Sequence, residues 1–124
     1  MARWAARTEV GRRLFPAAVA RAGFTFLLPY DGFHPEAGKH ILVIGAASWS
    51  DPDLLALDRL AINLSGRAIQ VVIFDVDYWQ LDDIVRAFPG AWCFKSTPVV
   101  LQYDGGALNY TGEGHDAVLW LDQI

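Results

Sequence analysis

Three groups of side chains in this 124-residue sequence have functional groups that could do chemistry. The stretch Trp49–Asp53 places one hydroxyl and two carboxylates between an apolar run and a helical pattern. Asp75 and Asp77 form an Asp-x-Asp pair at the end of a second apolar run, and Cys93 is the only thiol. The first group could cap a helix, the second could transfer a phosphoryl group with magnesium, and the third could take part in redox reactions.

The first group has a simple structural interpretation as the start of a helix. Ser50 or Asp51 can accept hydrogen bonds from the free N–H groups of a first helical turn, and Pro52 is tolerated there. Asp53 places a carboxylate where the helix dipole favours an anion. This interpretation predicts a well-capped helix that begins near Pro52.

The Asp-x-Asp pair resembles the first motif of haloacid-dehalogenase-type phosphatases, in which an apolar strand ends in two aspartates. The resemblance implies that Asp75 is a nucleophile and Asp77 a general acid beside magnesium, which makes a phosphatase one alternative. Only 47 residues follow Asp77, however, and Trp79 stands where that motif has Thr or Val. The preferred interpretation is that Asp77 ends a strand and caps a helix that begins at Trp79.

Thiol and metal chemistry have less support from the sequence. Lys95 would favour the thiolate form of Cys93, which makes a monothiol redox enzyme a second alternative. A cysteine between aromatic residues is more typical of a small buried apolar side chain, which is the interpretation that we prefer. His34, His40 and His115 lack the spacing of a metal site, so neither a metal nor another cofactor is expected.

The elements that must position these groups follow from hydrophobic periodicity and from breaks at Gly and Pro. Apolar runs predict strands at 24–28, 40–45, 69–76, 99–103 and 107–111. Helical spacing of apolar residues predicts helices at 53–64, 79–88 and 115–124. Before them, we expect a helix at 3–13 and a second one that Pro16 opens and Gly23 ends. Strands that alternate with helices need crossover connections, so the predicted fold is α/β, with a mixed central sheet flanked by helices.

Charge divides the chain into two parts. Residues 1–22 hold five Arg and one Glu, a net charge of +4, whereas residues 23–124 hold five basic and thirteen acidic residues, a net charge of −8. We therefore expect a basic, solvated helical segment at 1–22 and one domain at 23–124, with a secretory or mitochondrial signal as alternatives for the first part. The acidic domain argues against nucleic acid as a partner, because that binding depends on cations that meet phosphates.

Two further features bear on where the protein works. No apolar run approaches the roughly 18 residues that span a bilayer, so no membrane association is expected. A single cysteine cannot form an intramolecular disulfide, which makes the reducing cytoplasm the expected location. The sequence leaves the oligomeric state open.

Several residues, in order along the chain, resemble the thioredoxin family. Trp49 and Pro52 stand where a thioredoxin has the Trp and Pro of Trp-Cys-Gly-Pro-Cys, after a strand and before a helix. Thr97 and Pro98 then lead into a strand and a hairpin with a Gly-Gly turn. The resemblance covers residues 23–124. It implies a thioredoxin-like fold in which the bond between Thr97 and Pro98 is cis and lies beside the Trp49–Asp53 loop.

The departures from the family concern its redox chemistry. Ser50 and Asp53 occupy the positions of the two family cysteines. A serine hydroxyl cannot form a mixed disulfide, and no second sulfur is present to resolve one. Ile44 and Ile73 align with the buried acid and lysine of the family, so its proton-handling pair is also missing. The sequence therefore predicts a redox-inactive member without catalytic residues.

The resemblance also implies a surface that binds protein. In the family, the loop, its Trp and the backbone before the cis-proline hold an extended substrate, and this mode of binding needs no chemistry. The expected peptide-binding residues are Trp49, Ser50, Asp51, Pro52, Asp53, Thr97 and Pro98. The expected partner is a neutral or basic protein or extended peptide, held by a chaperone-like accessory domain. Residues 20–24 and 86–88 also bear a more distant likeness to hydrogenase-maturation chaperones with a thioredoxin-like fold.

Overall fold

The computed structural model describes residues 9–124, with side chains described from Leu14 onward. Its helices are α1 (Glu9–Arg21), α2 (Asp51–Asn63), α3 (Leu81–Ala87) and α4 (Gly114–Gln123), and a short 3-10 helix, η1, spans Val76–Tyr78. Its strands are β1 (Thr25–Phe26), β2 (His40–Ala46), β3 (Gln70–Asp75), β4 (Val99–Asp104) and β5 (Ala107–Glu113). Within this part of the chain, no helix is long and apolar enough to cross a membrane.

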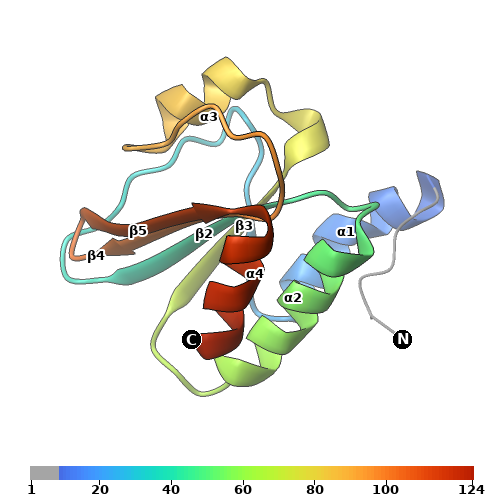
Figure 1. The fold of residues 1–124 in the computed structure, drawn as a ribbon, viewed down its shortest axis with the longest axis horizontal. Helices are drawn as coiled ribbons and strands as arrows, with labels where there is room; N and C mark the ends of the chain where they lie inside the picture. The colour runs from blue at the N-terminus through green and yellow to red at the C-terminus, as the bar shows by residue number, and fades with distance from the viewer. Residues whose placement is uncertain (1–8) are drawn as a thin grey trace.

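The strands form one five-stranded mixed sheet in the order β1-β3-β2-β4-β5. The first three are parallel to one another, β4 is antiparallel to β2, and β5 is antiparallel to β4. Helices α1, α2 and α4 lie on one side of the sheet, and α3 lies on the other (Figure 1). The predicted α/β class, a mixed sheet flanked by helices with an additional N-terminal helix, is confirmed.

The central strand β2 is apolar on both faces of the sheet, so both faces must be buried against other elements. All of its residues from 41 to 46 are buried. Leu42 and Ile44 point to the side of α1, α2 and α4, whereas Ile41 and Val43 point to the side of α3. Successive side chains of a strand alternate between faces, so a continuous apolar run places apolar groups on both.

The face covered by α3 holds an aromatic core. The ring centroid of Phe74 lies 5.1 Å from that of Phe88 and 5.2 Å from that of Trp79. Phe33, from the loop between β1 and β2, lies 5.2 Å from Phe88 and 5.5 Å from Tyr103. These rings join β3, β4, the loop and the end of α3 into one packed layer.

The predicted helix at 79–88 is shorter than expected and begins later. Strand β3 ends at Asp75, whose Oδ1 accepts a hydrogen bond from the N–H of Asp77 at 3.0 Å and caps η1. Trp79 follows in extended backbone and is only 7% exposed, and α3 begins at Leu81. The expectation that Asp77 caps a helix starting at Trp79 is therefore wrong, because the indole is buried in the aromatic core instead of continuing the helical pattern.

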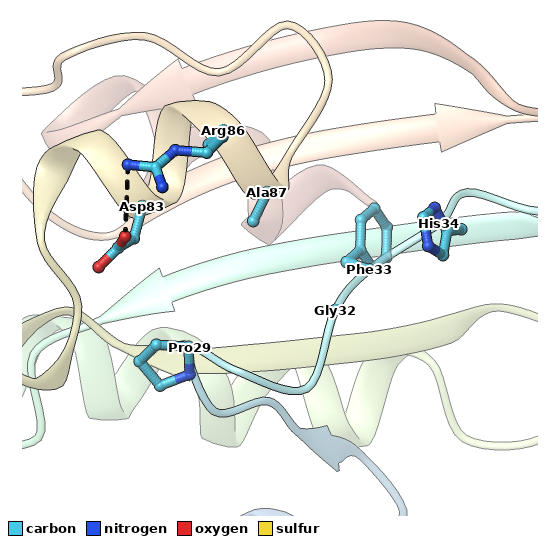
Figure 2. A pocket seen from close by; sticks show the side chains of 7 residues that line it. All are labelled: Pro29, Gly32, Phe33, His34, Asp83, Arg86 and Ala87. Atoms are coloured by element: carbon cyan, nitrogen blue, oxygen red, sulfur yellow. Dashed lines mark ion pairs between the residues drawn. The ribbon is translucent and has the colours of Figure 1, made fainter.

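A hollow of about 290 Å³ lies between α3 and the loop that joins β1 to β2. Figure 2 shows Pro29 and Phe33 on the loop, and Asp83 and Arg86 on α3, where they form an ion pair at 3.7 Å. The guanidinium is largely exposed to solvent, and exposed pairs of this kind contribute little to stability. None of the predicted binding residues lines this hollow.

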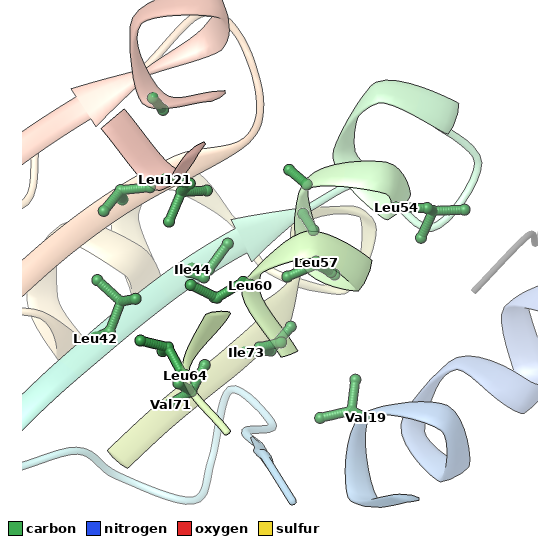
Figure 3. Packing of buried hydrophobic residues seen from close by; sticks show 14 of the residues in the cluster. Val19, Leu42, Ile44, Leu54, Leu57, Leu60, Leu64, Val71, Ile73 and Leu121 are labelled. Carbon is green, nitrogen blue, oxygen red and sulfur yellow. The ribbon is translucent and has the colours of Figure 1, made fainter. Parts of the chain in front are cut away.

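The opposite face of the sheet holds an aliphatic core (Figure 3). Its side chains come from α1, α2, α4, β2, β3 and β4 and include Val19, Leu42, Ile44, Leu54, Leu57, Leu60, Leu64, Val71, Ile73, Val100 and Leu121. The leucines of α2 recur at helical spacing, so one side of the helix is apolar along its whole length. Full burial of each such side chain stabilises the fold by about 1.5–3 kcal/mol.

The N-terminal region contains one described helix in place of the two expected. Helix α1 runs through Pro16, which was expected to open a second helix. Proline removes one helical hydrogen bond, but Phe15, Ala18 and Val19 are buried in the aliphatic core and hold the helix in place. Residues 3–8 of the first predicted helix lie outside the described residues.

Gly45 of β2 lies against the ring of Phe74, and a Cβ at this position would overlap that ring. The ring cannot easily move aside, because it packs against Trp79 and Phe88. We predict that Gly45→Ala lowers the free energy of unfolding by about 1–3 kcal/mol, measured by urea denaturation. Ala107→Ser, at the exposed start of β5, is the control. Equal stability of Gly45→Ala and the wild type would contradict the overlap.

Candidate functional site

The two stretches that were predicted to bind a peptide follow β2 and precede β4. Helix α2 begins shortly after β2 ends, and Asp53 lies in its first turn. Val99, the first residue of β4, is paired with Gly45 near the end of β2. Antiparallel pairing therefore brings the residues just before β4 close to the residues just after β2. The bond between Thr97 and Pro98 is cis.

The carboxyl group of Asp53 connects these two stretches. Its Oδ2 accepts a hydrogen bond from the N–H of Ala47 at 2.9 Å, and the residue is only 1% exposed. The hydroxyl groups of Ser50 and Thr97 also interact with this carboxyl group. Because Ala47 and Ser50 precede α2 and Thr97 precedes β4, one buried side chain contacts both halves of the predicted site.

Burial sets the protonation equilibrium of Asp53. Desolvation raises the pKa of its carboxyl group above the ordinary value of 3.8, and the contacts with Ala47, Thr97 and Ser50 lower it by a smaller amount. Its Oδ1 has no hydrogen bond of normal geometry within the described residues, so the two hydroxyl contacts are weak ones. The charged form of Asp53 is thus only partly compensated, which favours the protonated form.

The other residues of the predicted loop differ in exposure. Trp49 is 48% exposed, Pro52 is exposed, and Ser50 and Asp51 are half-buried. Ser50 is the N-cap residue of α2, but its side chain makes no capping hydrogen bond. The expected side-chain cap at Ser50 is therefore absent, because its hydroxyl faces the Asp53 carboxyl group instead.

Thr97 and Pro98 form the other half of the candidate site. Thr97 is half-buried and Pro98 is buried, and the carbonyl oxygen of Pro98 accepts a hydrogen bond from the N–H of Gly114 at 2.9 Å. The backbone N–H and C=O of Thr97 make no hydrogen bond to other described residues. Thr97 thus presents a backbone donor and a backbone acceptor beside the Asp53 contact.

Glu113, which the sequence analysis did not single out, holds the segment that leads to Thr97. Its Oε1 accepts a hydrogen bond from Nε1 of Trp92 at 3.0 Å. Its Oε2 accepts hydrogen bonds from the N–H groups of Lys95 and Ser96 at 2.7 and 2.9 Å, and from Oγ of Ser96 at 3.2 Å. The bond from Trp92, followed by those from Lys95 and Ser96, lowers the pKa of Glu113 to about 2.

The two positions that the sequence resemblance aligns with the buried acid and lysine of the thioredoxin family hold apolar side chains. Ile44 and Ile73 are direct neighbours in the parallel pairing of β2 and β3, and neither is exposed. Both belong to the aliphatic core. The positions aligned from the sequence therefore do lie together, and they hold no group that could transfer a proton.

The remaining candidates take structural or isolated positions. Asp75 is 1% exposed and caps η1, whereas a nucleophilic carboxylate must reach its substrate. Cys93 is exposed, so its expected role as a small buried apolar residue is wrong. Within the described residues, no three His, Cys, Asp or Glu side chains lie close enough together to hold a metal ion.

Comparison with known proteins gives likeness in structure only. No protein-family model matches the chain, and no curated protein matches it. Among solved structures, it is similar to the germline-specific thioredoxin Deadhead of Drosophila melanogaster, with 16% identity over 97% of both chains and a TM-score of 0.48. It is also similar to chloroplastic thioredoxin z, with 20% identity over 91% of this chain and 90% of that one and a TM-score of 0.45.

The arrangement of elements decides the fold independently of these likenesses. A parallel pair, β2 and β3, is continued by the antiparallel strands β4 and β5, with α2 following β2 and α4 following β5. The fold is thioredoxin-like. Ser50 and Asp53 stand at the positions that the sequence resemblance aligns with the two family cysteines.

The raised pKa of Asp53 predicts how stability changes with pH. A group whose folded pKa is higher than its unfolded value contributes stability that is complete below the unfolded value, here 3.8, and lost as pH rises through the folded pKa. Asp53→Asn removes this loss and keeps an acceptor for Ala47. We predict that it raises the free energy of unfolding at neutral pH by about 1 kcal/mol, measured by urea denaturation.

The matched control for this prediction is Asp82→Asn, an exposed aspartate on α3. The stability difference between Asp53→Asn and the wild type should grow from about pH 4 to about pH 8, whereas Asp82→Asn should follow the wild type. Parallel curves for Asp53→Asn and the wild type would show that the carboxyl group is compensated in its charged form.

The lowered pKa of Glu113 predicts that its contribution to stability changes with pH in the opposite direction. Its folded pKa, about 2, lies below the ordinary value of 4.5, so its contribution is present above pH 4.5 and is lost as pH falls toward 2. We predict that Glu113→Gln lowers the free energy of unfolding at neutral pH by about 1 kcal/mol, because a neutral amide accepts hydrogen bonds more weakly. Glu36→Gln, which removes an exposed ion pair with Lys39, is the control. Equal losses in the two variants would contradict a special role for Glu113.

Proposed function

We propose that this chain is a thioredoxin-like protein without dithiol chemistry that binds an extended segment of a partner protein. We call the proposed binding site the docking surface, and it consists of Trp49, Ser50, Asp51, Pro52, Asp53, Thr97 and Pro98. The observation that carries the proposal is the Asp53 carboxyl group, which interacts with Ser50 on one side and with Thr97 on the other. These contacts tie the two stretches together although neither a disulfide nor a thiol is present there.

The groups at this surface suit an extended peptide. Trp49 offers a large, half-exposed apolar side chain, and rigid aromatic anchors of this kind often dominate binding. Thr97 offers a backbone N–H and C=O, which can pair with the backbone of an added strand. Trp49 could therefore hold one side chain of a bound peptide while the backbone of Thr97 pairs with the main chain of that peptide.

The absence of dithiol chemistry follows from the residues at the site. The chain has one cysteine, Cys93, so it cannot form an intramolecular disulfide. Ser50 and Asp53 stand at the positions of the nucleophilic and resolving thiols, and neither can form a mixed disulfide. Binding and release of a partner is then the activity that this surface can supply.

The charge of the protein bears on the choice of partner. Residues 23–124 carry a net charge of −8, which favours a neutral or basic partner and predicts that association weakens with salt. A chaperone-like accessory role in the cytoplasm is consistent with a surface that binds without reacting. The distant likeness of residues 20–24 and 86–88 to hydrogenase-maturation chaperones supports the same class of role and names no client.

One alternative function is favoured by a specific observation, which is the exposure of Cys93. An exposed thiol can form a mixed disulfide with a partner thiol when an oxidant is supplied. This monothiol role would replace the docking proposal if disulfide reduction by the purified protein were measurable and were lost in Cys93→Ser. The magnesium-dependent phosphatase is not proposed, because Asp75 is buried as a helix cap.

The docking proposal is tested by substitution of its anchor. Proteins that bind the wild type would be recovered from the native host, and their affinities measured with Trp49→Ala. We predict that a specific partner is bound at least about tenfold more weakly, because a buried aromatic anchor often contributes 2 kcal/mol or more.

The control for this experiment is Ile62→Ala. Ile62 is an exposed apolar residue, 68% accessible, near the other end of α2. Loss of binding in Trp49→Ala but not in Ile62→Ala is the expected result. Equal binding by all three proteins would show that Trp49 is not the anchor. Loss of binding in both variants would show that the effect is not specific to Trp49, which also contradicts the prediction.

A further inference from the structure

The buried polar residues of the described chain lie at one end of the sheet. They are Ser48, Asp53 and Asp75. Ser48 and Asp53 follow the end of β2, and Asp75 ends β3, where it is paired with Ala46. The side chain of Asp53 interacts with two residues of the docking surface, Ser50 and Thr97. A change at its carboxyl group is therefore transmitted directly to the place where a partner would sit.

Resting on the proposed docking function, we propose that docking of the partner is coupled to proton uptake by Asp53, so that the partner binds more tightly when this carboxyl group is protonated. The coupling needs no movement of the fold. It arises because the same side chain is buried beneath the docking surface and contacts two of its residues, Ser50 and Thr97.

The direction of the coupling follows from desolvation. Asp53 is 1% exposed, but Ser50 and Thr97 above it are only half-buried and remain in contact with solvent. A docked segment would exclude water from these residues and so deepen the burial of the carboxyl group. Deeper burial disfavours the charged form, and by linkage the complex then takes up a proton as it forms.

The two hydroxyl groups act in the same direction. When Asp53 is charged, it can only accept hydrogen bonds, so the O–H group of Ser50 or Thr97 has to turn toward it if Oδ1 is to have a donor. When Asp53 is protonated, it can donate to one of these hydroxyl oxygens, which frees that O–H group for the partner. The protonated state therefore offers more hydrogen-bonding capacity at the docking surface.

Charged neighbours do not account for this behaviour. The charged side chains on the elements around Asp53 include Asp51, Asp58 and Arg59 on α2, Asp75 at the end of β3, and Lys95 and Glu113 near Thr97. The causes that set the pKa of Asp53 are its burial and the bonds with Ala47, Thr97 and Ser50, and none of these charged side chains is among them. The pH dependence that we propose therefore arises from the burial of Asp53 and not from a charged neighbour.

The experiment uses peptides selected on the full-length protein from a library of uncharged decapeptides without histidine. Their affinities are measured by fluorescence anisotropy between about pH 4 and about pH 8. For the wild type we expect affinity to fall as pH rises through the pKa of Asp53, by at most about tenfold per pH unit, because one proton is involved. Asp53→Asn should bind at every pH with the affinity that the wild type reaches at low pH.

Two controls separate this coupling from other titrations. Asp82→Asn keeps Asp53 and should retain the pH dependence of the wild type. In the wild type, the carbon-13 signal of the Asp53 carboxyl group should titrate at a higher pH with peptide bound than without it. This second measurement needs no variant.

Each outcome decides a different claim. Affinity that is independent of pH, or an unchanged titration of Asp53 on binding, overturns the coupling and leaves the docking function intact. Equal pH dependence in Asp53→Asn and the wild type assigns the effect to another group and also overturns it. Failure to select any peptide whose binding requires Trp49 overturns the docking function and this inference with it.

Discussion

The position of β2 between a parallel and an antiparallel neighbour is the constraint on which the rest of the structure depends. Ile44 pairs with Ile73 of β3 on one side and with Val100 of β4 on the other. The parallel neighbour requires a crossover, which α2 supplies, and the antiparallel neighbour returns the chain to the edge where α2 begins. Two segments far apart in sequence, around Asp53 and around Thr97, are thereby brought together by backbone pairing alone.

Their contact then has to be completed by side chains, and here the protein uses a carboxyl group. Asp53 satisfies the N–H of Ala47 and contacts the hydroxyls of Ser50 and Thr97, but its burial opposes the charge that would strengthen these bonds. A buried polar group of this kind is costly unless its hydrogen bonds are complete. The local structure is thus specific in geometry and modest in net stabilisation, as the proposed coupling to proton uptake requires.

The sequence predicted best the features that depend on local pattern. The apolar run of β2, the leucine spacing of α2 and the hairpin around Gly105 each follow from residues that are neighbours in the chain. Prediction failed where distant contacts override that pattern. Pro16 stays inside α1 because the flanking residues are buried, and Trp79 leaves the expected helix to join the aromatic core. Cys93 is exposed although aromatic residues flank it in sequence.

The candidate site was also predicted only in part from the sequence, and Thr97 shows why. Its place beside the Trp49–Asp53 loop was expected from the family resemblance, but the groups that fix it were not. Asp53 contacts Thr97 from α2, Glu113 holds Ser96 from β5, and Gly114 bonds to Pro98, and only the folded chain brings these residues together. A backbone held on both sides loses little further freedom when a partner binds, which favours affinity through a small contact area. Under the proposed docking function, Glu113 would be a positioning residue, because its hydrogen bonds to Lys95 and Ser96 hold the segment that leads to Thr97.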